Sequence, residues 1–145
     1  MSETSTMHDV AVRRLTPVLA VDAVEPSLEF WEKRVGFTKT VEVPHESSVG
    51  FAILVKDDIE LMLQSVASIR ADLGAHTGQI DGRSTALFVE VADLAAVERS
   101  LEGYPIEMPR RTTFYGMMEI GVREPGGHFV VFAQPEKREG SHAGS

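Results

Sequence analysis

The chain has no cysteine among its 145 residues, which excludes disulfides, thiolate catalysis and zinc held by cysteine. It also lacks basic charge: 14 Lys and Arg stand against 22 Asp and Glu, a net charge of −8. Binding to nucleic acid or to an anionic membrane surface rests on basic charge, so this balance argues against both. The sequence contains neither a membrane-spanning apolar run nor a secretory signal. We therefore expect a soluble, cytoplasmic protein.

What is present is the composition of an ordinary globular protein, with 43% hydrophobic and 25% charged residues. A chain of this length can bury a self-sufficient core. We expect one domain over residues 13–135. The ends, 1–12 and 136–145, are polar and are expected to be disordered tails.

Hydrophobic periodicity predicts the same order of elements twice. Strands are expected at 15–21, 37–43, 49–55 and 59–63, with a helix at 27–34 after the first of them. Pro17 lacks a backbone donor, which places the first strand at a sheet edge or near its own start. The segment 65–84 is expected to be a linker, with a short helix at 66–73. Further on, strands are expected at 86–91, 104–109, 117–123 and 128–133, with a helix at 93–101.

The two halves also match at an offset of 70 residues. Leu19-x-Val21-x-Ala23 falls on Val89-x-Val91-x-Asp93, and Leu63-Gln64 falls on Ala133-Gln134. The sequence therefore predicts two β-α-β-β-β modules, about 13–64 and 85–135.

Three segments give this pattern a family resemblance. They are T-P-V-L-A-V at 16–21 followed by S-L-E-F-W at 27–31, I-E-L at 59–61, and V-R-E-P-G-G-H at 122–128. In this order the sequence resembles the vicinal oxygen chelate superfamily, the glyoxalase, bleomycin-resistance and extradiol-dioxygenase group. It is most similar to metal-free bleomycin-resistance-like members. The resemblance implies an α+β fold of two tandem βαβββ modules, curved mixed sheets around a cavity, and a homodimer.

The resemblance also implies four metal-ligand positions, which fall on Thr16, Glu60, Ala86 and Val131. Three of these side chains offer no competent ligand, and one carboxylate does not hold a catalytic divalent ion. We therefore expect no metal and no other cofactor. A non-standard site built from His45, His76 and Glu60 stays open as an alternative. His128 is expected to be a turn histidine facing away from the ligand positions.

Period-two alternation places further side chains on the faces of the ligand positions. In the superfamily geometry these faces line one small-molecule pocket. The aromatic and methionine side chains before the seventh strand are further candidates, because they stack on or adapt to a ligand. Arg110 and Arg111 precede them, either as ligand contacts or as a solvated edge. The predicted ligand-binding residues are Thr16, Val18, Glu60, Met62, Gln64, Phe88, Tyr115, Met117 and Val131. Taken singly, Phe51, Phe88, Phe129 and Phe132 are expected to be core.

These observations predict a metal-independent protein that binds a small molecule and sequesters an antibiotic or a related amphipathic or aromatic compound. The acidic balance suits a cationic ligand such as bleomycin. The alternative is a metal-dependent enzyme of glyoxalase, epimerase or lyase type, with Glu60 as the candidate base. A third hypothesis is a degenerate module that binds another protein.

Overall fold

The computed structural model describes residues 11, 13–74 and 85–136. The expected tails, except for two of their residues, and positions 75–84 of the expected linker lie outside this part. Within the described ranges no helix is long and apolar enough to cross a membrane.

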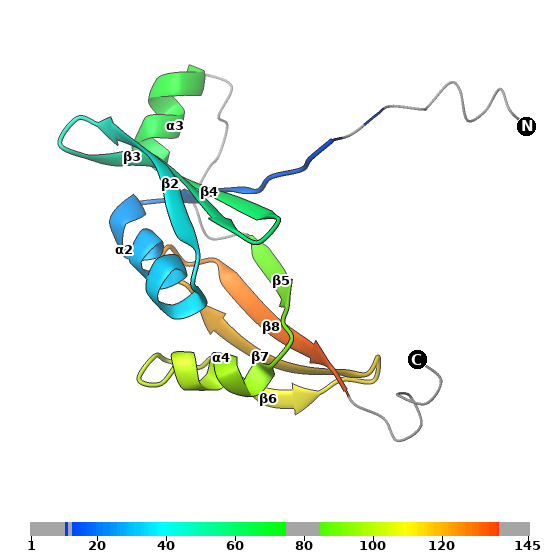
Figure 1. The fold of residues 1–145 in the computed structure, drawn as a ribbon. Helices are drawn as coiled ribbons and strands as arrows, with labels where there is room; N and C mark the ends of the chain where they lie inside the picture. Colours follow the sequence, from blue (N-terminus) through cyan, green and yellow to red (C-terminus); the bar gives the residue numbers. More distant parts are fainter. Residues whose placement is uncertain (1–10, 12, 75–84, 137–145) are drawn as a thin grey trace, which may run out of the picture.

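The chain forms two four-stranded mixed sheets with the same connectivity (Figure 1). In the first sheet the order is β1-β4-β3-β2, and in the second it is β5-β8-β7-β6. The pairs β1–β4 and β5–β8 are parallel, and the other neighbours are antiparallel. The strands of the first sheet are β1 (Val18–Val21), β2 (Thr38–His45), β3 (Ser48–Lys56) and β4 (Ile59–Ser65). Those of the second are β5 (Ala86–Glu90), β6 (Met108–Thr112), β7 (Met117–Arg123) and β8 (Phe129–Pro135).

This arrangement confirms the predicted two βαβββ modules and the α+β class. β1 lies at a sheet edge and begins directly after Pro17, in agreement with both places that the missing backbone donor of Pro17 allows. The expected helix at 27–34 forms as α2 (Val24–Glu29), which runs directly into the π-helical segment η1 (Phe30–Val35). Gly36 ends it with a φ of 93°, a conformation that suits glycine. The other helices are α3 (Val66–Leu73) and α4 (Leu94–Ser100).

Each sheet has two unlike faces, which we call closed and open. On the closed faces, alternate residues are buried against helices and form one core shared by both modules. In Figure 1, α2 lies between the first sheet above and the second sheet below. The closed-face residues of this core include Leu19, Val21, Leu54, Leu61, Leu63, Ile120, Val122, Val130 and Phe132.

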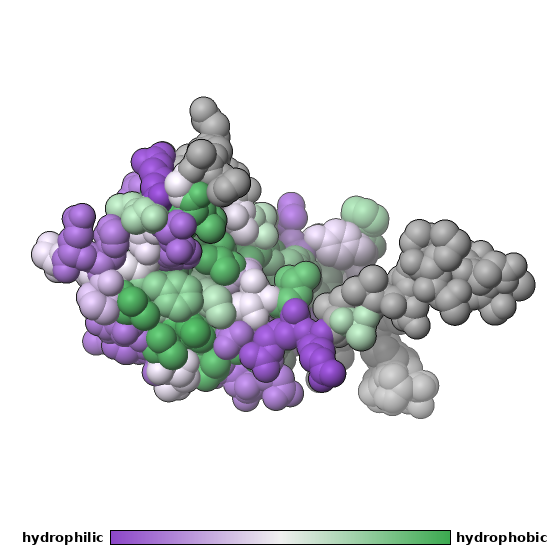
Figure 2. All heavy atoms as spheres, turned by 90° about the horizontal axis from the view of Figure 1, so that it is seen from above, coloured by the Kyte–Doolittle hydropathy of each residue, from purple (hydrophilic) through white to green (hydrophobic). Residues whose placement is uncertain are grey.

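The open faces carry the alternating residues that point the other way, and these are partly or largely exposed, apart from a few that are buried. Apolar side chains form a broad area on one side of the molecule, bordered by hydrophilic ones (Figure 2). By strand pairing, the open face of the first sheet includes Val18, Val41, Val43, Phe51, Ile53, Glu60, Met62 and Gln64. That of the second includes Phe88, Glu90, Arg111, Met117, Glu119, Gly121, Phe129 and Val131.

One strand prediction was wrong. The strand expected at 104–109 begins four residues later, as β6 at Met108. Tyr104 explains the shift, because its ring packs on Phe30 of the first module, with ring centroids 5.1 Å apart. Its hydroxyl also donates to the carbonyl of Arg123. The chain after α4 is therefore held at the junction of the modules before it reaches the sheet.

Candidate functional site

The first two ligand positions predicted in module one lie side by side. The Thr16 hydroxyl donates to Glu60 Oε1 at 2.9 Å, and Arg14 Nη1 lies 3.2 Å from the same oxygen. The Glu60 side chain is 19% exposed, whereas that of Arg14 is 68% exposed. Glu60 is thus held by a hydroxyl and a solvated guanidinium at the rim of the first open face. An exposed ion pair of this kind contributes little to stability.

These residues line a pocket of about 440 Å³ where the edges of the two sheets meet. Thr16 and Glu60 come from the first module, and Phe88 and Glu90 from the second. Its walls are mostly apolar, as in small-molecule sites generally. Asp58 also lines it, and the remaining lining residues are apolar: Leu15, Pro17, Trp31, Phe37, Ile59, Leu61, Leu87 and Val89.

The pocket therefore brings together three of the predicted binding residues, Thr16, Glu60 and Phe88. Val18, Met62 and Gln64 share the first open face with Glu60 but do not line this pocket. Gln64 donates from Nε2 to Ser68 Oγ of α3 at the far end of that face. Met117 and Val131 lie on the second open face, and Tyr115 reaches it from the turn before β7.

The expectation that Phe88 belongs to the core was wrong, since Phe88 is 56% exposed. It stands on an edge strand and faces away from α4, so within the described part of the chain no helix covers it. Of the four phenylalanines expected in the core, Phe132 is 1% exposed and is core, whereas Phe51 and Phe129 are only partly buried. Val18, in the corresponding place on β1, is 48% exposed.

A second polar cluster occupies the open face of the second sheet: the sequence predicted Tyr115 and, as one alternative, Arg111 as ligand contacts, but Glu119 between them was missed. Glu119 is 1% exposed, yet it lies on this face, paired across the strands with Ala133 and Arg111. Its Oε1 accepts hydrogen bonds from Arg111 Nε at 3.1 Å and Nη2 at 3.0 Å. Its Oε2 accepts one from the Tyr115 hydroxyl at 2.6 Å. That hydrogen bond to the carboxylate raises the pKa of Tyr115. The period-two pattern of β7 was the available signal, because it places Glu119 on the face of Met117.

The donor set does not fit the metal that the fold family implies. Thr16 and Glu60 meet, but Ala86 lies opposite Phe129 and Val131 opposite Phe88, and none of these four offers a ligand atom. The alternative metal site, built from His45, His76 and Glu60, is not supported either. The register places His45 and Glu60 at opposite ends of the first sheet, and His76 lies outside the described residues. In the described part of the chain no three His, Asp or Glu side chains are grouped to hold an ion.

His128 has a structural place at the junction of the modules. It is 1% exposed, and its Nε2 lies 2.8 Å from the carbonyl of Ala20 in β1. Glu124, at the start of the same hairpin, is also 1% exposed and accepts from Trp31 Nε1 at 3.2 Å. The E-P-G-G-H hairpin of module two is thus inserted into module one and away from the open faces.

The glyoxalase, bleomycin resistance protein and dioxygenase superfamily model matches residues 12–132. The chain therefore belongs to this superfamily. No curated protein matches the sequence.

Solved structures of the same fold include proteins with different roles. A glyoxalase/bleomycin resistance protein/dioxygenase from Nocardioides is 20% identical with a TM-score of 0.71, covering 95% of this chain and 93% of its own. The bleomycin-binding protein of bleomycin-producing Streptomyces verticillus, solved with copper(II)-bleomycin, is 22% identical with a TM-score of 0.61, covering 89% and 99%. A lactoylglutathione lyase from Agrobacterium tumefaciens is 15% identical with a TM-score of 0.66, covering 86% and 94%. At these identities the likeness shows the fold, and the site has to decide the function.

Proposed function

We propose that this member of the glyoxalase and bleomycin-resistance superfamily binds a small molecule without a metal, and sequesters an antibiotic or a related amphipathic, aromatic compound. In this proposal it is a cytoplasmic homodimer in which each open face is covered by the partner's open face and by the ligand. The ligand-binding residues are those predicted from the sequence, with Glu60 as a hydrogen-bond acceptor.

The observation that carries the proposal is the exposure of Phe88 and Val18 on the two open faces, together with an apolar pocket that Phe88 lines with residues of both modules. Contiguous apolar surface of this kind marks a binding site rather than a solvent-facing surface. Metal-independent binding is supported by the side chains at the four ligand positions of the family, since Glu60 contacts only Thr16 and Arg14 in the described part of the chain, and Ala86 and Val131 offer no ligand atom.

The direct test is calorimetric titration with metal-free bleomycin in the presence of EDTA. We expect binding that persists in EDTA and weakens with salt, because the protein is acidic and this ligand is cationic. Phe88→Ala should weaken binding about tenfold, the equivalent of burying one aromatic side chain. Ile106→Ala is the matched control: Ile106 is 39% exposed but belongs to neither open face, and its loss should leave binding unchanged.

The enzyme alternative makes the opposite prediction. Turnover of lactoylglutathione in the presence of Ni²⁺, abolished by Glu60→Gln, would replace the binding proposal. If neither bleomycin nor a wider set of small molecules raises the melting temperature, the chain is not a small-molecule-binding protein.

A further inference from the structure

The second open face holds an arginine and a tyrosine in fixed positions around a buried carboxylate. Glu119 is almost fully buried, and a buried charge is costly unless it is paired and hydrogen-bonded. Both oxygens of this carboxylate accept hydrogen bonds: Arg111 donates twice to Oε1 and Tyr115 once to Oε2. Glu119 therefore has little capacity left for a ligand, and its effect is to orient its two partners.

The two partners are themselves open to solvent. The Arg111 side chain is 55% exposed and Tyr115 is 52% exposed, although both are anchored at their polar ends. Arg111 uses Nε and Nη2 for Glu119, and among the described residues its Nη1 has no partner. An anchored guanidinium with free N–H groups is arranged to donate to an acceptor in its plane. Because it is already oriented, a ligand that uses it loses little further side-chain freedom.

Aromatic surface lies directly beside this donor. The ring of Phe114, which is fully exposed, meets the Tyr115 ring edge to face at 5.1 Å. Phe88 and Val131 stand on the same open face, on β5 and β8. A flat ring would find aromatic and apolar partners here, next to a fixed hydrogen-bond donor.

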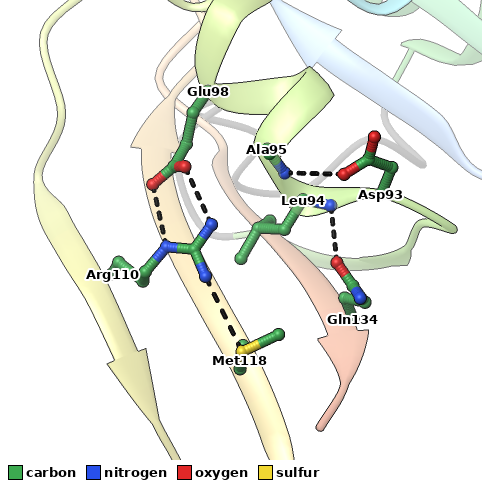
Figure 3. A network of polar contacts seen from close by, with 7 residues as sticks. All are labelled: Asp93, Leu94, Ala95, Glu98, Arg110, Met118 and Gln134. Carbon is green, nitrogen blue, oxygen red and sulfur yellow. Dashed lines mark hydrogen bonds and ion pairs between the residues drawn. The ribbon is translucent and has the colours of Figure 1, made fainter. Parts of the chain in front are cut away.

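The neighbouring arginine provides an internal comparison. Arg110 also makes a two-point ion pair, with Glu98 of α4, but on the closed side of β6 (Figure 3). Its third nitrogen, Nη1, contacts Met118 Sδ at 3.6 Å. Arg110 and Arg111 thus make similar ion pairs but differ in their remaining nitrogen. That of Arg110 contacts Met118, whereas that of Arg111 is free to donate on the open face.

We propose that Arg111 and Tyr115, positioned by Glu119, form the recognition subsite for a planar aromatic ligand that carries a carboxylate or carbonyl oxygen. The ring stacks on Tyr115, and the oxygen accepts from Arg111. This rests on the proposed function and adds the chemistry of one end of the ligand. The cross-strand row that contains Arg111 also holds two acidic residues, Glu90 and Glu119. We nevertheless expect the subsite to prefer a hydrogen-bond acceptor, because Arg111 is the group with a free donor.

The test is an NMR titration of the full chain with two probes of the same ring, 2-naphthoate and 2-naphthylmethylammonium. We expect the wild type to bind the carboxylate about tenfold more tightly, the lower end of the value of one charge-assisted hydrogen bond, with shifts at the amides of Arg111 and Tyr115. Arg111→Gln should reverse the order of the two probes, because the Glu119 charge is then unopposed. Arg110→Gln is the matched control and should leave the ratio unchanged.

A second variant protects the test against misfolding. The double change Arg111→Gln and Glu119→Gln leaves no unpaired buried charge on this face, and it should lower naphthoate affinity about tenfold without changing that of the ammonium probe. The proposal is overturned if the wild type prefers the ammonium probe, if neither probe binds, or if the Arg111 variants keep the wild-type ratio. If the protein binds bleomycin but does not prefer naphthoate, the subsite is wrong and the proposed function stands. If it prefers naphthoate but does not bind bleomycin, the subsite stands and the antibiotic is not the ligand.

Discussion

At the scale of single residues, the described structure contains buried polar groups with opposite roles. Glu119 is satisfied by side chains that are exposed and so can respond to a ligand. Glu124 is satisfied by Trp31 and by the amide of His128, 3.5 Å away, inside the junction of the modules. His128 Nδ1 and Ser27 Oγ nearby have no partner among the described residues. The junction is thus a structural polar centre, whereas the open face is where we propose that a ligand binds.

The first prediction concerns Glu124. Replacing it by Ala leaves the Trp31 indole N–H buried without an acceptor, and should destabilise the fold by about 2 to 3 kcal/mol. Urea unfolding followed by the fluorescence of Trp31, the single tryptophan, measures this directly. The control is Glu107→Ala: this side chain is 51% exposed, and its loss should cost no more than about 0.5 kcal/mol. Equal effects of the two changes would contradict the role assigned to Glu124.

At the scale of elements, α4 is held on the second sheet by polar contacts at both ends (Figure 3). Asp93 caps its start by accepting from the amide of Ala95, and Gln134 of β8 accepts from that of Leu94. Near its other end, Glu98 pairs with Arg110 of β6 at 2.8 Å. The hydrogen bond from Arg110 lowers the pKa of Glu98 below its usual value of 4.5.

The lowered pKa of Glu98 determines how the stability contributed by its ion pair with Arg110 changes with pH. A lowered carboxyl pKa stabilises the fold above the unfolded value, and that contribution is lost as pH falls through the folded pKa. The stability difference between wild type and Glu98→Gln should therefore be present at pH 7 and vanish as pH drops below 4.5. Both side chains are more than a third exposed, so we expect a difference below about 1 kcal/mol. A difference that persists unchanged at pH 3 in paired urea titrations would contradict this assignment.

The elements were largely predictable from the sequence, because their patterns are local. The alternation in 117–123 gave β7 with the bounds observed, and Val66–Leu73 forms the expected helix. β6 was misplaced because Tyr104 is held by Phe30, a contact 74 positions away that no local pattern contains. The exposure of Phe88 was also missed, because it depends on the packing of the helices and modules and not on the local sequence. Alternation tells which residues share a face, but the packing of the modules decides which face is covered.

At the scale of the whole molecule, α2 packs on the closed face of the first sheet and α4 on that of the second. One core joins the two modules through α2 and η1, and both open faces carry apolar residues that these helices do not cover. The homodimer that we propose would cover the exposed Val18 and Phe88 and close the apolar pocket that Phe88 lines.

Native mass spectrometry of the full chain, purified without chelators and then exposed to Ni²⁺ or Mn²⁺, distinguishes metal-independent binding from a metal enzyme in one experiment. We expect the mass of a dimer that takes up no divalent ion before or after exposure, and that gains the mass of bleomycin when it is added. One divalent ion retained per chain would contradict it. In that case Glu60 would belong to a metal centre, and the enzyme would replace the binding protein.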